Sequence, residues 1–372
     1  MHNAIKPGLN PGDTVAWHRW LQPLQGAMAG QNAPLDRKFI EAELEAYAKK
    51  RGPTNRTQLL TCLRTHLDAA KAGLRDAFYD NNDGAVYVGM YAWTIDILLQ
   101  MLYAETRKHC CGGGDMAVIA VGGYGRGEMA PYSDIDIMIL MPKNTTAAHT
   151  KFIEFMLYIL WDLGLKIGHS TRSISESIAA ARDNQTVLTS LLEMRYVAGD
   201  KLLWTELARA VQNEIGKQKP LVFVEEKLAE RDVRHKRFGD TRYVVEPNVK
   251  DGKGGLRDLH SLFWIAKYAY RATSIVDIVK QGVLRDGEAR KFALAQRFLW
   301  TVRCHLHLQA GRAEERLDFE AQMTIAPRLG FADRGGMRGV ERFMKRYYLA
   351  VRNVGNLTRI FCAAMETDFR KS

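Results

Sequence analysis

Two short apolar runs joined by a glycine-rich segment constrain the fold of this chain more than any other feature. Residues 116–121 read MAVIAV and residues 135–141 read IDIMILM. Both runs have the length and the apolar content of buried strands. The segment between them contains GGYGRGEMAPYS, which is far too short for a helical crossover. We therefore predict two strands of one small sheet, connected by a glycine-rich loop.

Two carboxylates stand at the start of the second predicted strand. Asp134 and Asp136 are two residues apart, and side chains on a strand alternate between its faces. Both acids are therefore predicted to point the same way, with their backbones about 6.5–7 Å apart. Mg²⁺ prefers oxygen ligands and is usually held by one or two carboxylates together with phosphate. The pair predicts a site for divalent cations that also hold a substrate triphosphate.

The glycine-rich loop is a candidate phosphate site. Gly122 and Gly123 follow the first strand directly, and Ser133 immediately precedes the acid pair. Glycines let backbone N–H groups approach a phosphate closely, and successive amides form anion-binding concavities. We expect Arg126 to reach a phosphate oxygen and Ser133 to donate its hydroxyl. No G-x-x-x-x-G-K-[ST] is present, and the loop leads into a strand, which excludes a P-loop and a dinucleotide-binding motif.

The rest of the chain is mostly helical in pattern. Further strands are predicted over 165–173 and 193–198, with Ser173 and Glu176 forming a capping box for the helix between them. The most apolar window, 85–104, carries Asp96 and Gln100 in its middle and is predicted to be a buried helix of a soluble protein. The predicted fold is α+β, followed by an all-helical domain. The predicted divisions are a loose lead-in over 1–35, an α+β domain over 36–200 and a helical domain over 201–372.

Composition narrows the class of protein. The chain of 372 residues carries a net charge of +11, which favours an anionic partner such as nucleotide phosphates, nucleic acid or an acidic protein. Its five cysteines are odd in number and lack C-x-x-C spacing, which argues against a disulfide framework and a structural zinc site. The first residues contain no apolar signal sequence. We expect a cytoplasmic protein without a membrane span.

A second glycine-rich stretch, EPNVKDGKGGLRDLH, occupies residues 246–260. One interpretation is a solvated turn in which Asp258 caps a helix that begins at Leu259. The other is a lid in which Lys250, Lys253 and Arg257 place positive charge over the triphosphate and the leaving pyrophosphate. We favour the lid, because two lysines, an arginine and three glycines within eight residues are unusual for a plain helix connection.

These motifs carry a family resemblance. A strand, Gly-Gly and then Ser-Asp-x-Asp on a second strand resembles the DNA polymerase β-like nucleotidyltransferases. Together with WDLGLKIGHSTRS, EPNVKDGKGGLRDLH and RNVGNLTRIF, the chain from about residue 36 onward resembles the GlnD family of bifunctional PII uridylyltransferase/uridylyl-removing enzymes. The resemblance implies transfer of UMP from UTP to a tyrosine of the PII signalling protein. It also implies Mg²⁺, with Mn²⁺ as a substitute, held by Asp134 and Asp136, and a nucleotide loop that includes Gly122, Gly123 and Ser133.

The chain departs from the family pattern in two ways. It has no His-Asp dipeptide and stops after the helical domain, so the family's HD phosphohydrolase and ACT domains are expected to be absent. In addition, Lys166 stands where some family members have an acid. Glu193 is the candidate for a third catalytic carboxylate in its place.

Three other functions stay open. A related family transfers adenylyl groups to glutamine synthetase with the same pair of acids. Lys166 and the missing domains would also fit a catalytically silent nucleotide-sensing module. The charge of +11 allows an RNA-tailing enzyme, which is disfavoured because no RNA-binding motif accompanies the predicted core.

Overall fold

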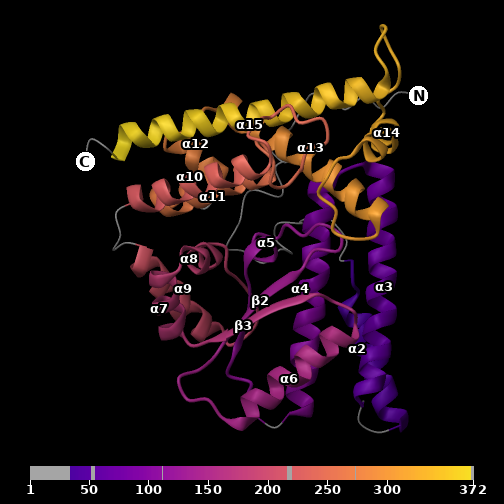
Figure 1. Cartoon of the computed structure of the whole chain (residues 1–372). Helices are drawn as coiled ribbons and strands as arrows, with labels where there is room; N and C mark the ends of the chain where they lie inside the picture. The colour runs from indigo at the N-terminus through magenta and orange to yellow at the C-terminus, as the bar shows by residue number, and fades with distance from the viewer. Residues whose placement is uncertain (1–33, 52–54, 111, 216–219, 273, 370–372) are drawn as a thin grey trace.

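A computed structural model describes residues 34–51, 55–110, 112–215, 220–272 and 274–369. The predicted lead-in over 1–35 lies almost entirely outside these residues. Figure 1 shows a small sheet at the centre, helices flanking it, and a layer of later helices stacked across one end. The fold is α+β with a mostly helical second half, as the sequence predicts. The predicted boundaries at 35 and 200 stay a prediction.

The sheet contains four strands in the order β3-β2-β1-β4. The central strand β1 (Ala117–Ala120) pairs antiparallel with β2 (Ile135–Leu140) and with β4 (Arg195–Gly199), and β3 (Ile167–Arg172) joins β2 in parallel. The four strands confirm the predicted strand positions to within two residues. Every residue of β1 is buried, which explains its continuous apolar run. In β2, Asp136 alone is not fully buried.

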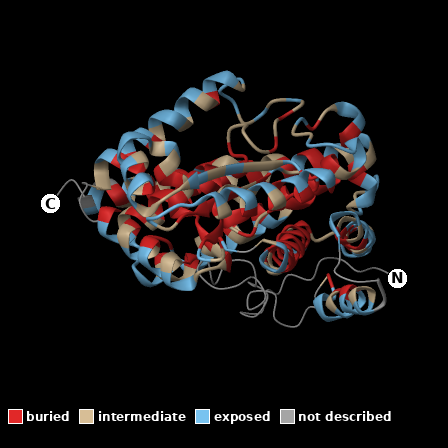
Figure 2. Cartoon of the chain, turned by 90° about the horizontal axis from the view of Figure 1, so that it is seen from below, coloured by how far each residue is buried: buried red, intermediate tan, exposed pale blue. Residues whose placement is uncertain are grey.

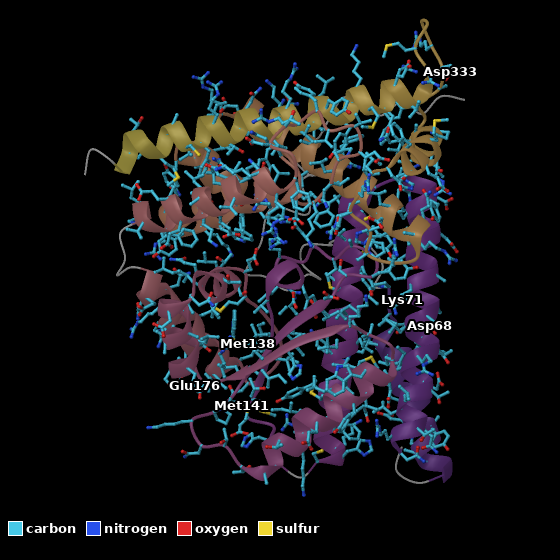
Figure 3. All side chains as sticks on the ribbon, viewed as in Figure 1. Asp68, Lys71, Met138, Met141, Glu176 and Asp333 are labelled. Atoms are coloured by element: carbon cyan, nitrogen blue, oxygen red, sulfur yellow. The ribbon has the colours of Figure 1, made fainter. Side chains whose placement is uncertain are left out.

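Helices begin where the sequence supplies caps. The predicted capping box forms at the start of α7 (Ile174–Asp183), where the Ser173 side chain accepts from the Glu176 N–H and the Glu176 side chain accepts from the Ser173 N–H. Figure 3 labels Glu176 at this point, with Met138 and Met141 on the neighbouring strand segment. The Ser177 hydroxyl of the same helix contacts the Met138 sulfur at 3.8 Å. Local caps and packing therefore fix α7 against the sheet.

The apolar window predicted to be buried forms α4 (Gly84–His109). Within the described residues this is the one helix long and apolar enough to cross a membrane, and 83% of its most apolar window is buried inside the protein. It packs against β4 on one side and α13 (Asp286–Ala310) on another. The helix is a core element that contacts both the sheet and the helical layer.

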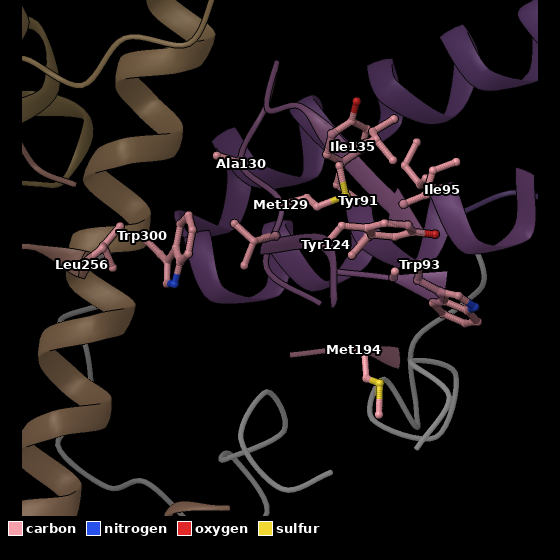
Figure 4. Close-up of a cluster of buried hydrophobic side chains, with 14 of the residues drawn as sticks. Tyr91, Trp93, Ile95, Tyr124, Met129, Ala130, Ile135, Met194, Leu256 and Trp300 are labelled. Atoms are coloured by element: carbon pink, nitrogen blue, oxygen red, sulfur yellow. The ribbon is translucent and has the colours of Figure 1, made fainter. Parts of the chain in front are cut away.

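A single hydrophobic core runs through both halves of the molecule. Figure 2 shows buried residues along the middle of the chain's packed elements and exposed residues on the outer faces. Figure 4 shows part of this core, where Tyr124 of the glycine loop lies near Tyr91 of α4, and Trp300 of α13 lies at the side of the same cluster. Tyr124 and Trp300 are both fully buried, so the loop and the helical layer share one core.

The remaining helices complete the two halves. On the sheet side they are α2 (Arg37–Arg51), α3 (Arg56–Asn81), α5 (Gly122–Gly125), α6 (Ala147–Asp162), α8 (Gln185–Leu192) and α9 (Lys201–Ile215). In the helical layer they are α10 (Pro220–Arg237), α11 (Leu256–Tyr270), α12 (Ile275–Lys280), α14 (Phe319–Arg328) and α15 (Gly339–Phe369).

Candidate active site

The acid pair lies at the end of the sheet that faces the helical layer. Asp134 is exposed just before β2, and Asp136 is partly buried within it. Burial raises the pKa of the Asp136 carboxyl, and the negative charges of Asp134 and Glu193 raise it further. Lys250 and Arg126 act in the opposite direction. The site therefore brings several carboxylates close together, and a cation from the glycine loop and one from the second glycine-rich stretch lie near them.

Two glycines leave room for the Asp136 carboxylate. Gly168 pairs with Asp136 across the β2–β3 ladder, and a Cβ added there would lie 2.3 Å from Asp136 Oδ1. A Cβ at Gly122 would lie 3.1 Å from Asp136 Oδ2, and this residue also adopts a φ of +60°, which favours glycine. The glycine of the loop and the glycine of β3 thus form a cradle for the acid. The loop spacing predicts a phosphate role for Gly122, whereas no motif in the sequence marks Gly168.

A buried ion pair anchors the glycine loop from behind. Arg195 at the start of β4 donates to both oxygens of Asp96 in α4, at 2.6 and 3.0 Å. The Tyr124 hydroxyl also donates to Asp96, at 2.6 Å, and Arg195 donates to the Tyr124 carbonyl at 3.1 Å. Both charged side chains are almost fully buried, at 3% and 6% exposure. This explains the acid inside an apolar helix and supplies two positioning residues that the sequence analysis missed.

Arg126 and Glu193 lie next to the acid pair but bind each other. The Arg126 guanidinium donates to Glu193 and, at 2.8 Å, to Glu128, and its side chain is only 6% exposed. Glu193 also accepts from the indole N–H of Trp264 in α11. Among the described residues, Asp134, Asp136 and Glu193 do not form a group with all ligand atoms within 4.8 Å of one another. The roles of Arg126 in phosphate binding and of Glu193 as a third carboxylate stay predictions.

The same ion pairs continue into the helical layer. Glu128 accepts from Gln296 of α13 at 2.7 Å and lies 3.2 Å from His260 Nε2 of α11. Burial opposes ionisation of Glu128, but the hydrogen bond from His260 and the charge of Arg126 outweigh it and lower its pKa to about 2. Burial and the charge of Arg126 lower the pKa of His260 to about 3. A charged, buried cluster therefore joins the loop to two helices.

A cleft of about 490 Å³ opens beside this cluster, between the sheet half and the helical layer. One wall is formed by Gly122, by side chains of α8 and by Glu193, which caps the C-terminal end of that helix. The opposite wall holds residues of α10 and α11 and of the loop between them: Lys227, Glu230, Val233, Arg234, Arg237, Phe238, Asp251, Arg257 and Trp264. Four of these nine side chains are basic. The excess of basic over acidic side chains on this wall favours an anionic ligand, and Gly122, where an added Cβ would lie 3.1 Å from Asp136 Oδ2, places the cleft next to the acid pair.

The second glycine-rich stretch is divided between this cleft and other surroundings. Arg257 lines the cleft, while the charge of Lys250 reaches Asp136. Lys253 does not line this cleft. Its ammonium donates to Asp240 Oδ1 at 2.7 Å, and both residues line a different hollow. Asp258 is not the helix cap considered in the sequence analysis. The helix begins at Leu256 with Gly255 as its N-cap, and Asp258 accepts from the Gly254 N–H and from Arg234.

Gly123, Ser133 and Lys166 lie in the segments next to the acid pair and are not among the residues that line the cleft. Gly123 lies in α5, and its carbonyl accepts from the Glu128 N–H at 2.9 Å. Ser133 lies partly buried in the turn before the acids, where its N–H donates to the Ala130 carbonyl. The backbone carbonyl of the exposed Lys166 accepts from the Ile135 N–H at 2.8 Å, so Lys166 lies beside the start of β2. An acid at position 166 would therefore lie near Asp134.

Comparison with known proteins identifies the two halves separately. The family described as "Nucleotidyltransferase domain" matches residues 105–188, and the family described as "GlnD PII-uridylyltransferase" matches residues 222–362. The bifunctional uridylyltransferase/uridylyl-removing enzyme of Rhodospirillum rubrum is 47% identical over 348 residues, which is 91% of this chain and 37% of that protein. The chain belongs to the GlnD family. Enzymes of the same name from Bradyrhizobium sp. (strain ORS 278) and Azospirillum brasilense are 45% and 44% identical over 92% of this chain.

The chain spans a little over a third of the length of these GlnD-family relatives, 37% in the first case. Both matched segments contribute to the cleft. The nucleotidyltransferase match contains the acid pair and its glycine cradle, and the GlnD match contains Arg257 and the remaining basic side chains. The cleft therefore lies where the two family segments meet.

Proposed function

We propose that this chain transfers UMP from UTP to a tyrosine of the nitrogen-regulatory protein PII and releases pyrophosphate. The observation that carries the proposal is the acid pair at the start of β2, next to Gly122 of a cleft whose opposite wall holds Arg257 and three further basic side chains. The names of the relatives support the uridylyl group, and the description of the matching family supports PII as acceptor.

We propose that Asp134 and Asp136 hold Mg²⁺, for which Mn²⁺ can substitute. Both offer carboxylate oxygens, the donors that Mg²⁺ prefers. The negative charges of Asp134 and Glu193 raise the Asp136 pKa along with burial, so a divalent cation there would relieve repulsion between ionised acids. When bound, the metal would neutralise charge on the triphosphate and on the leaving pyrophosphate.

The protein's own groups orient the reactants and stabilise charge. The tyrosine oxygen attacks the α-phosphorus of UTP, and the bond from this phosphorus to the oxygen bridging to the β-phosphate breaks. Pyrophosphate leaves, and the phenolic proton passes to solvent. Arg257 and Lys250 approach from the helical layer, where positive charge stabilises the leaving group. The amides of the glycine loop and the Ser133 hydroxyl hold the phosphates from the sheet side.

The decisive experiment compares two isosteric substitutions in the same assay. Asp136→Asn removes one charged ligand, so we expect uridylyl transfer to PII to fall on the order of 10³-fold, the equivalent of several kcal/mol. Asp115→Asn is the matched control, because Asp115 lies before β1, at the strand's opposite end, and pairs with His149. Intact mass spectrometry of PII after incubation with UTP and Mg²⁺ measures the increment. Full activity in Asp136→Asn would contradict the proposal.

Two alternatives have distinct outcomes in the same experiment. An adenylyl increment on glutamine synthetase with ATP, and none on PII with UTP, would assign the chain to adenylyl transfer. Binding of UTP without an increment on either acceptor would indicate a nucleotide-sensing module. Lys166 motivates this second alternative, because it places a cation beside the start of β2.

A further inference from the structure

Three potential metal ligands lie close together in a part of the molecule formed by α2 and α3, which does not include the acid pair. Glu43 of α2 and Cys62 and His66 of α3 place one ligand atom each within 4.8 Å of one another. His66 Nε2 lies 2.8 Å from Glu43 Oε2. Within the described part of the chain, no other group of three His, Cys or acidic residues converges in this way.

Helix geometry brings the three residues together. Cys62 and His66 are four residues apart on α3, so their side chains lie on one face, one turn from each other. Glu43 comes from α2, which packs against α3 and buries Ile40 and Leu44. The lack of C-x-x-C spacing argues against a structural zinc site of the zinc-finger type. A helical C-x-x-x-H pair completed by a second helix does not need that spacing.

The surroundings order the ligands and leave one side open. Phe39 packs edge-on against the His66 ring, with centroids 5.7 Å apart, which fixes the ring that presents Nε2. Cys62 is 7% exposed, whereas the side chains of His66 and Glu43 are 21% and 50% exposed. A metal would therefore be held against the helices by sulfur and remain open to water on its outer side.

We propose that Glu43, Cys62 and His66 form a zinc site, with one water molecule as the fourth ligand. Sulfur, imidazole nitrogen and carboxylate oxygen are the donors that Zn²⁺ takes in tetrahedral sites. Forming the metal–sulfur bond releases the thiol proton of Cys62 to solvent. The site would clamp α2, which buries only Ile40 and Leu44 among its described side chains, to α3. It is independent of the proposed uridylyl transfer.

Cobalt substitution tests the site directly. The purified full chain is stripped with a chelator and titrated with Co²⁺ alone. We expect one Co²⁺ per chain, a thiolate-to-cobalt charge-transfer band and the visible bands of a tetrahedral ion. Zn²⁺ should displace the cobalt and raise the melting temperature, because a ligand that binds only the folded state stabilises it. Absence of the charge-transfer band in the folded chain would overturn the proposal.

Matched variants locate the site. Cys62→Ser should abolish the charge-transfer band, and Cys362→Ser should keep it. His66→Gln and Glu43→Gln should each weaken Co²⁺ binding at least about tenfold, since even an outer-shell change costs 10–100-fold. His109→Gln, an exposed histidine on α4, should not. Asp136→Asn should also keep the band, which separates this site from the proposed Mg²⁺ site. His66 and Glu43 are partly exposed, so their substitutions should leave the fold intact and keep the test valid even if Cys62→Ser fails to fold. Unchanged Co²⁺ binding and an unchanged band in both His66→Gln and Glu43→Gln would refute the assignment.

Discussion

The two walls of the cleft are held in place in different ways. On the sheet side, Asp136 lies on a strand between two glycines, and a buried ion pair anchors the loop beside it. On the helical side, Arg257 of α11 and three basic side chains of α10 line the cleft. The first wall is fixed by backbone register and buried partners, and the second by how the helical layer packs. Substitutions should therefore damage the first wall through structure and the second through charge.

The anchor behind the sheet wall gives the largest expected loss of stability. Asp96→Asn leaves the Arg195 guanidinium buried without a carboxylate, so we expect the free energy of unfolding to fall by about 3–5 kcal/mol. Urea unfolding measures this change. The double substitution of Asp96→Leu with Arg195→Met removes both charges and should recover part of the loss. A double variant less stable than Asp96→Asn would show that the charges are not the cause.

The glycine cradle gives the next effect, on activity rather than on stability. In Gly168→Ala the new Cβ would lie 2.3 Å from Asp136 Oδ1, so the carboxylate must move. A displacement near 1 Å in a positioned group costs about a hundredfold in rate, and we expect transfer to PII to fall by about that factor. Gly73→Ala is the control, because nothing lies within 4 Å of its added Cβ. Equal activity in the two variants would disprove the cradle.

The same contrast explains what could be predicted from the sequence. The acid pair, its strand and the loop glycines follow from local spacing, so all four strands and the position of Asp136 were predictable. The partners of Arg126, Glu193 and Lys253 depend on contacts between segments far apart in the chain. Local spacing holds no information on these contacts. Asp96 was visible as an acid in an apolar helix, but its partner Arg195 lies 99 residues away.

The buried cluster that joins the two walls should make stability depend on pH. His260 has a pKa of about 3 in the folded state against an ordinary 6.5, so below pH 6.5 the unfolded chain gains a proton that the folded chain refuses. Glu128 has a pKa of about 2 against 4.5, so its contribution is complete above pH 4.5 and is lost toward pH 2. Both shifts make the free energy of unfolding fall as the pH drops from 6.5 to 3.

Urea unfolding at several pH values checks this expectation. His260→Gln should flatten the slope between pH 6.5 and 4.5, and Glu128→Gln should flatten it below pH 4.5. His169→Gln, an exposed histidine on β3, is the control and should keep the original slope. A wild-type curve that is flat over this range would contradict the assigned protonation states.

Two cations of the second glycine-rich stretch, Lys253 before α11 and Arg257 in its first turn, provide the smallest and most selective comparison. Arg257 lines the cleft, whereas Lys253 binds Asp240 in a separate hollow. A charge-assisted hydrogen bond contributes about 1.5–3 kcal/mol, so Arg257→Gln should weaken UTP binding by about tenfold or more. Lys253→Gln loses its bonds to the Oδ1 and carbonyl oxygens of Asp240, whose side chain is 62% exposed, and these lie outside the cleft, so UTP affinity should stay within about twofold. Calorimetric titration with UTP and Mg²⁺ distinguishes the two. Equal weakening in both variants would contradict this division of roles, because Lys253 would then have to leave Asp240 and enter the cleft together with Arg257.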